Sequence, residues 1–314
     1  MSALAAAVER VRSRERARAP RPNLTIKDTW WRHLVGIVAV LVSLFPVWFT
    51  VSAAFNRDNS ISGTSFWPAH PTTQNFTQIL TNTVPDPAST SYVESHFLRW
   101  FANTLLIAVI TAVLTVLLGA LTAYAFSRFR FKGRRIGMTF LLLVQMFPQL
   151  LMVVAIYLIV LNVGGIFHFI GLNSYSGLVV VYLGGALGVN AWLLYGFFNT
   201  IPTELDESAR VDGATPAQIF WGVVLPLALP VLIVVGLISF VSTLNEFVIA
   251  SAILRTQGHL TLPLGMHQFI DQQYGQRWGP FAAGSLIAAV PAAVLFMSLQ
   301  KWLVGGLTQG AVKG

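Results

Sequence analysis

Side chains that could do chemistry are scarce in this sequence of 314 residues. Glu246 is the only acidic residue inside a long apolar run. A carboxylate buried in a membrane is a candidate for function because burying a charge in lipid is costly. Near the end of its run, this carboxylate could instead be solvated or hydrogen-bonded between helices. Carboxamides in apolar runs could face an aqueous path or join helix to helix; the candidates are Gln145, Gln149, Asn190 and Asn245.

Catalytic patterns are missing from the sequence. There is no cysteine, which excludes disulfides, thiolate metal sites and cysteine nucleophiles. The six histidines are scattered at spacings that do not resemble a metal site. No nucleophile–base pair or pair of carboxylates falls in an apolar run, which disfavours an intramembrane enzyme. No glycine-rich loop with a lysine is present to cradle phosphates, so we expect no cofactor on this chain.

One polar segment, 199–226, contains capping and helix-ending residues that predict two short helices. Thr203 is a candidate N-cap for the first helix, with Asp206 three residues on. Gly213 is placed to end that helix as a C-terminal glycine. Acidic residues favour a helix N-terminus because of the helix dipole, and the first turn holds Glu204, Asp206 and Glu207.

The second helix of this segment has a complete start signal. Thr215 caps it, Pro216 takes its first position and Gln218 completes a capping box. A helix–glycine–helix elbow between two membrane spans forms a rigid projection, and rigidity matters where force is transmitted. The alternative is a well-capped loop that only returns the chain to the membrane.

The elements that must position these residues lie in a membrane. Hydrophobic residues are 55% and charged residues 10% of the chain, against roughly 25% charged in soluble proteins. The mean hydropathy is +0.67. These values exclude a soluble enzyme, a disordered chain and a fibrous repeat, because a soluble globule needs more charge on its surface.

Six apolar runs are long enough to span a bilayer. The sequence therefore predicts an all-α polytopic membrane protein with six transmembrane helices. The expected spans are 34–55, 101–126, 137–161, 176–198, 225–252 and 279–304.

The net charge of +8 is concentrated beside the spans, which indicates topology signals rather than a nucleic-acid surface. With six spans, sixteen Lys and Arg residues fall on the side of the N-terminus and four on the other. The positive-inside rule then places both termini in the cytoplasm. The expected organisation is a basic arm (1–33), a membrane domain (34–304) with external loops 56–98 and 253–278 and a cytoplasmic loop 199–224, and a cytoplasmic tail (305–314).

The cytoplasmic segment resembles the EAA loop of membrane subunits of binding-protein-dependent ABC importers. The family pattern is E-A-A-x-x-D-G-A followed by L-P, and Ser208 replaces its first alanine with another small residue. The resemblance implies that the residues matching this pattern, together with Glu204, couple the chain to an ATPase. The matching residues are Glu207, Ser208, Ala209, Asp212, Gly213, Ala214, Leu225 and Pro226.

Within that superfamily, the chain is similar to MalG-type maltose permease subunits over nearly its whole length after residue 34. The arginine-rich first 30 residues are not part of the resemblance. The segments that carry it, besides the loop, are 123–131, 145–148, 169–173, 182–185 and 301–314.

The resemblance implies a type I importer permease in the bacterial inner membrane that carries maltose, maltodextrin or trehalose. It implies four kinds of partner: a MalF-like second permease, a MalK-like ATPase homodimer holding ATP and Mg²⁺, an extracellular solute-binding protein or lipoprotein, and the lipid bilayer. In this family the sugar is held mostly by the partner permease. Glu246 and the carboxamides named above are therefore weaker candidates for a translocation path, where they would bond sugar hydroxyls. The tail either reaches toward the ATPase or is a frayed end.

The segment from Arg255 to Pro263 joins two spans on the predicted external side. The connection 255–278 is longer than a simple turn needs. In the maltose-type family, the matching loop inserts into the binding protein. We therefore expect a tip made of Thr256, Gln257, Gly258 and His259 to do so, the alternative being a surface loop on the partner permease.

A proton-coupled secondary transporter is the main alternative function. Such a transporter usually needs several intramembrane acids or bases, and this chain offers Glu246 alone. The sequence therefore favours the passive subunit of an ATP-driven importer.

Overall fold

The structure is a computed structural model that describes residues 26–57, 66–85, 92–93, 95–271 and 276–311. The chain divides by its contacts into two units, residues 1–49 and 50–314, and each is described by itself. The first unit is built on α2 (Ile26–Ala54), whose segment Trp30–Ala54 is long and apolar enough to cross a membrane. Most of the predicted basic arm lies outside the described residues.

The second unit holds the other candidate spans. Three are single helices: α4 (Phe97–Arg128), α7 (Tyr175–Phe198) and α14 (Trp278–Ala311). Two more are bent pairs, α5 (Arg134–Gln145) with α6 (Gln149–Ile166), and Pro216–Leu227 with α11 (Leu229–Leu244). Counting each pair as one span gives six with α2, and the all-α, polytopic prediction is confirmed.

Prolines account for both bends. The α5–α6 pair turns by 107° at Pro148, where the sequence analysis expected one straight span from 137 to 161. Proline has no N–H to donate and disfavours a helical residue before it, so the helix breaks there. The second pair turns by 78° at Ala228, just before Pro230, which likewise has no N–H for a continuous helix.

The predicted span 225–252 is also shorter in the structure. Helix α11 ends at Leu244, and a new helix, α12 (Val248–Ile253), begins after Phe247. The other short helices of this unit are α3 (Gln74–Leu80), η1 (His168–Ile170), α8 (Glu204–Val211), α9 (Pro216–Ile219), the π-helix η2 (Phe220–Val224), α10 (Leu225–Leu227), η3 (Gln257–His259) and α13 (Leu262–His267).

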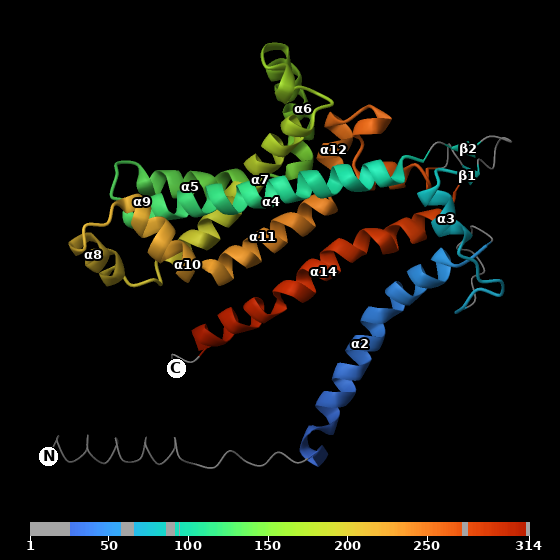
Figure 1. The fold of residues 1–314 in the computed structure, drawn as a ribbon, viewed down its shortest axis with the longest axis horizontal. Helices are drawn as coiled ribbons and strands as arrows, with labels where there is room; N and C mark the ends of the chain where they lie inside the picture. The colour runs from blue at the N-terminus through green and yellow to red at the C-terminus, as the bar shows by residue number, and fades with distance from the viewer. Residues whose placement is uncertain (1–25, 58–65, 86–91, 94, 272–275, 312–314) are drawn as a thin grey trace. The chain divides into compact units, whose positions relative to one another are not determined.

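Helix α4 is the central element of the second unit. It packs along α7 and α11, and α11 in turn contacts α14 (Figure 1). One apolar cluster lies toward the end that carries α8, α9 and α10, and includes Tyr124, Phe198, Ile201, Ile219 and Phe220. Another lies toward the end that carries α3 and α13, and includes Ile79, Phe97, Trp100, Met266 and Phe269.

The predicted loop 56–98 contains local structure among its described residues. Helix α3 (Gln74–Leu80) contacts α4 and α14, with Ile79 fully buried. Strands β1 (Val84–Pro85) and β2 (Tyr92–Val93) pair antiparallel, Val84 opposite Val93. This segment therefore closes one end of the bundle instead of forming a plain connection.

The C-terminal tail begins as helix. Helix α14 continues to Ala311, beyond residue 304 where the sequence analysis ended the last span. Residues 312–314 lie outside the described part of the chain. A role of the tail at an ATPase stays a prediction.

Candidate functional site

Two short helices joined by a left-handed glycine form the elbow, residues 199–226. At the end of α8, Gly213 N–H donates to the carbonyl of Arg210 (3.0 Å) and Ala214 N–H to that of Ala209 (2.9 Å). This is the bond pair of a Schellman motif. Gly213 has φ of +83°, a backbone conformation that L side chains rarely adopt. The glycine stop predicted for this helix is confirmed.

Helix α9 begins with the predicted capping box. The Thr215 hydroxyl accepts from the backbone N–H of Gln218 (3.4 Å), and the Gln218 side-chain oxygen accepts from that of Thr215 (2.8 Å). Pro216 follows in the first turn, where its missing N–H costs nothing. The start of the second helix is therefore fixed by the chain's local sequence.

The start of α8 differs from the expectation. Thr203 holds the N-cap position, but its side chain makes no capping hydrogen bond. Its backbone is already helical, with φ of −71° and ψ of −18°, instead of the extended form of a capping residue. Asp206, three residues on, is 2% exposed and points into the protein.

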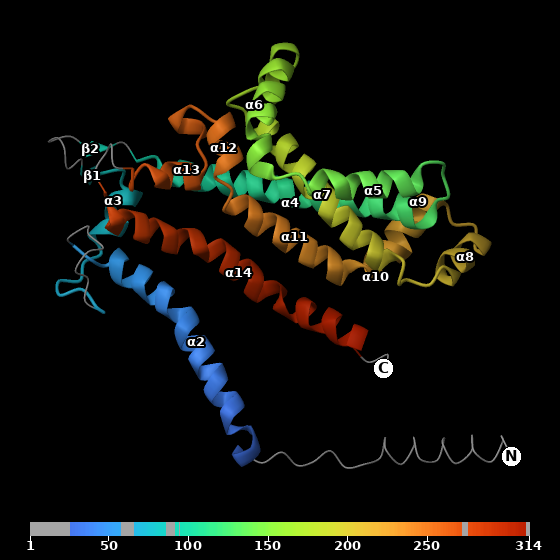
Figure 2. The same ribbon diagram turned by 180° about the vertical axis from the view of Figure 1, so that it is seen from behind.

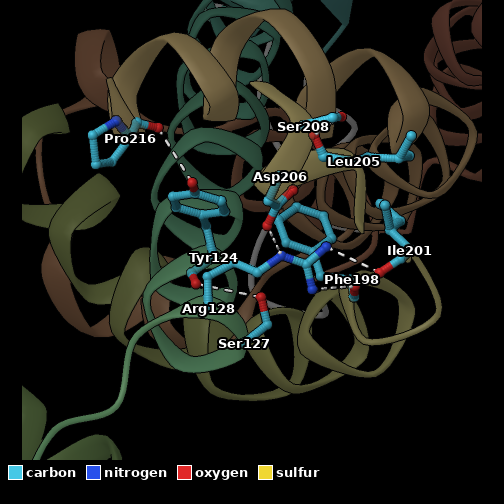
Figure 3. A network of polar contacts seen from close by, with 9 residues as sticks. All are labelled: Tyr124, Ser127, Arg128, Phe198, Ile201, Leu205, Asp206, Ser208 and Pro216. Atoms are coloured by element: carbon cyan, nitrogen blue, oxygen red, sulfur yellow. Dashed lines mark hydrogen bonds and ion pairs between the residues drawn. The ribbon is translucent and has the colours of Figure 1, made fainter. Parts of the chain in front are cut away.

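Asp206 pairs with Arg128, the last residue of α4 (Figure 3). The Nε of Arg128 lies 2.5 Å from Oδ2 of Asp206, and both side chains are 4% exposed or less. The two terminal nitrogens of Arg128 donate to the carbonyls of Phe198 (3.2 Å) and Ile201 (3.1 Å). One guanidinium thus joins the ends of α4 and α7 to the first turn of α8.

Tyr124 makes a second link, one helical turn before Arg128. Its hydroxyl donates to the carbonyl of Pro216 at 3.2 Å, at the start of α9. The last turn of α4 therefore holds both helices of the elbow. Tyr124 and Arg128 were not among the residues expected to be functional. The available signal was that Arg128 is the first cation of a basic turn at the end of a predicted span, two residues before Arg130.

The residues of the predicted coupling loop divide between an outer and an inner face. Ala209, Ala214 and Leu225 are half-buried against the apolar cluster of α4, α7 and α9. The others are exposed: Glu204, Glu207, Ser208, Asp212, Gly213 and Pro226. The elbow (Figure 2, labels α8 to α10) thus presents acidic and small polar side chains outward while Ala209 and Ala214 pack inward.

The segment 255–260, which holds the predicted binding-protein residues, is fastened to the bundle instead of forming a free tip. The indole N–H of Trp100 donates to the carbonyl of Gln257 (2.9 Å). The amide of Asn103 donates to the carbonyls of Gly258 and Leu260 (3.0 Å each). Gly258 packs closely on α4, since a Cβ at this position would lie 3.2 Å from the Arg99 guanidinium.

Asn173 holds the other side of this segment. Its Oδ1 accepts from the backbone N–H groups of Arg255 and Thr256 (3.0 Å each), and its amide contacts the Thr256 hydroxyl. The Nδ1 of His259 lies 2.8 Å from the Asn173 carbonyl. Asn173 has φ of +59°, which asparagine tolerates better than most residues. The side chains of Thr256 and Gln257 remain exposed, so a binding-protein contact there stays a prediction.

Glu246 is a helix cap in this structure. Its carboxylate accepts from the backbone N–H groups of Ile249 (2.8 Å) and Ala250 (3.0 Å), at the start of α12. The hydroxyl of Tyr182 on α7 donates to it as well, at 2.6 Å. This is the hydrogen-bonded alternative considered from the sequence, and it explains how one carboxylate is accommodated in an apolar run.

The carboxamides take different positions. Gln145 donates to the carbonyl of Gly185 on α7 at 2.6 Å, so it joins helix to helix. Asn190 is buried on α7, and the side chain of Gln149 lies outside the described part of the structure. Asn245 lines a cavity of about 510 Å³, together with Phe101, Thr104, Leu244, Leu262, Pro263, Met266, His267, Ile270, Phe281, Ser285, Ala288, Ala289 and Ala292.

The fold is that of an ABC importer permease. The chain superposes on a chain of a bacterial ABC transporter that imports the polysaccharide alginate, with a TM-score of 0.71 at 21% identity, over 90% of this chain and 98% of that one. A model of the family described as "binding-protein-dependent transport system inner membrane component" matches residues 115–309. The chain belongs to this family.

Relatives extend the similarity to almost the full length. The chain is 38% identical to the galactooligosaccharides transport system permease protein GanQ of Bacillus subtilis, over 90% of this chain and 94% of the relative. It is also 38% identical to the maltose/maltodextrin transport system permease protein MalG of Vibrio vulnificus, over 91% and 96%. The family resemblance inferred from the EAA loop is confirmed.

Proposed function

We propose that this chain is the transmembrane permease subunit of an ATP-driven importer for small oligosaccharides of the maltose or maltodextrin kind. The elbow carries this proposal. Its inner side is bonded to two spans, and its outer side exposes Glu204, Glu207 and Asp212. Such an element can receive a partner protein on one side and move the spans on the other. The relatives that share the fold are permeases for malto- and galactooligosaccharides.

The partners follow from this role. A second permease completes the path, two ATPase subunits meet the elbow, and an extracellular binding protein delivers the sugar. ATP and Mg²⁺ belong to the ATPase subunits in this proposal. The distribution of Lys and Arg along the sequence supports a cytoplasmic location for the elbow and for both termini.

The sugar passes between the two permeases, and this chain supplies part of the wall. The cavity that Asn245 lines combines that amide and His267 with the rings of Phe101 and Phe281, which are groups that suit a carbohydrate. The Glu246 carboxylate accepts hydrogen bonds from two backbone N–H groups and a tyrosine hydroxyl. This bonding favours an importer over a proton-coupled transporter, which would need the carboxylate to exchange protons.

The test is reconstitution of the four kinds of subunit in proteoliposomes. We expect uptake of radiolabelled maltose or maltodextrin that requires ATP and the binding protein, and is indifferent to a proton gradient. Glu207→Lys should weaken binding of the ATPase through charge reversal on the exposed face of α8. Uptake that follows a proton gradient without ATP would contradict the proposal. Normal ATPase binding by the Glu207→Lys subunit would contradict the role of the elbow.

A further inference from the structure

Helix α8 is attached to the bundle in an unusual way. Within α8, all of whose residues the structure describes, Asp206 is the one side chain that is buried. A helix of eight residues is not stable by itself in water. Its position therefore depends on the chain at its two ends, on the half-buried Ala209 and on this one fully buried carboxylate.

The partner of that carboxylate gives the attachment a direction. The Arg128 guanidinium is planar and holds its donors in a fixed fork. It contacts Asp206 through Nε and the carbonyls of Phe198 and Ile201 through its two other nitrogens. Those carbonyls lie at the C-terminal end of α7 and just beyond it, and the carbonyl of Phe198 also accepts from the N–H of Ile201 (3.2 Å). The guanidinium is thus fixed from three sides.

Burial makes this joint strong. Both side chains of the pair are 4% exposed or less, so water cannot easily replace either partner. Breaking a buried pair leaves an uncompensated charge and is strongly unfavourable. An apolar contact of similar size has no preferred direction and would let α8 slide over α4.

We infer that Arg128 is a positioning residue that makes α8 and the end of α4 move together, so that a force on the elbow passes into α4. This inference rests on the proposed function, in which an ATPase pushes on α8. It assigns the transmission of that force to the Arg128–Asp206 pair, and leaves contact with the ATPase to the exposed residues of the elbow.

The test replaces the charged pair by apolar residues of similar volume, Arg128→Met with Asp206→Leu, in the reconstituted complex. Such replacements of buried pairs often leave stability unchanged. We expect assembly with the ATPase and ATP hydrolysis to persist, while sugar imported per ATP falls by about tenfold, a typical size for coupling between sites. A ratio equal to that of the unmodified complex would overturn the inference, and so would release of the ATPase.

Arg128→Lys is the second variant, in case the subunit with the apolar pair does not fold. Lysine keeps the charge but lacks the fork of three nitrogens that contacts Asp206 and both carbonyls at once. We expect an assembled complex with a lowered ratio of sugar to ATP, and a full ratio would overturn the inference. Failure of the proposed function itself would look different, since the Glu207→Lys subunit would then bind the ATPase and transport normally.

Discussion

The elbow and the segment 255–260 are both polar connections between helices, and they are held in opposite ways. The elbow is held by one buried ion pair, one tyrosine hydrogen bond and the apolar packing of Ile201, Ile219 and Phe220, and its acidic residues other than Asp206 are exposed. The segment 255–260 is fastened by neutral hydrogen bonds from Trp100, Asn103 and Asn173, spread over its backbone. The first arrangement suits an element that moves as a rigid piece under load, and the second suits a fixed brace between spans.

The largest effect should come from the joint between the two elbow helices. Gly213→Val places a β-branched residue at φ of +83°, where a side chain costs roughly 1–2 kcal/mol and the Schellman bonds would be lost. We expect the subunit to reach the membrane but uptake to be abolished, measured by transport of labelled sugar beside immunoblots of the membrane fraction.

Gly213→Asn is the matched control, because asparagine tolerates left-handed backbone. It should retain much of the uptake. Equal uptake by the valine variant and the unmodified subunit would show that the geometry of the elbow does not matter.

The next effect concerns the stability of the joint to α4. Asp206→Ala leaves the Arg128 guanidinium buried without its counterion, which should cost about 3–5 kcal/mol. The measurement is the thermal unfolding midpoint of the purified complex. Asp212→Ala, at an exposed acid of the same elbow, should change stability by no more than about 0.5 kcal/mol. If Asp206→Ala and Asp212→Ala lowered the stability equally, the buried acid would contribute no more than the exposed one, which would contradict this prediction.

A smaller effect is expected from the brace. Asn173→Gly keeps the backbone conformation but removes the acceptor for the N–H groups of Arg255 and Thr256, at a cost of about 1–3 kcal/mol. Hydrogen exchange should speed up at those two amides and stay unchanged in the elbow. Asn173→Asp, which keeps the acceptor oxygen, is the control; unaltered exchange in the glycine variant would contradict the account of this segment.

The smallest effect is expected at Glu246. Tyr182→Phe removes one of its three hydrogen bonds, and the two backbone donors remain. The unfolding free energy should fall by about 1 kcal/mol, with uptake nearly unchanged. A large loss of uptake at unchanged stability would instead indicate that this carboxylate takes part in transport.

The sequence was sufficient for the number of candidate spans and for the joint between the two elbow helices, because both depend on neighbours along the chain. The capping box of Thr215 and Gln218 and the left-handed Gly213 are of this kind. The bend at Pro148 could have been predicted from the same local rules. The Arg128–Asp206 pair could not, since it joins residues far apart in sequence and nothing near either one indicates the other.

The segment 255–260 also depends on contacts between residues far apart in the sequence. Its small and polar residues indicated a tip for a binding protein, but they did not indicate that its carbonyls and N–H groups are bound by Trp100, Asn103 and Asn173 from other parts of the chain. Local composition indicates polarity, and only the packed fold shows which polar groups are already occupied.

The central claim is that the elbow, and not the segment 255–260, meets the ATPase. The chain has no cysteine, so single cysteines can carry a photoreactive cross-linker in the assembled complex. Val211, which is 87% exposed on α8, and Gln257, exposed in the brace, give the two sites. The account predicts that Val211→Cys cross-links to the ATPase subunit and Gln257→Cys does not. A Gln257→Cys cross-link to the ATPase, or none from Val211→Cys, would contradict it.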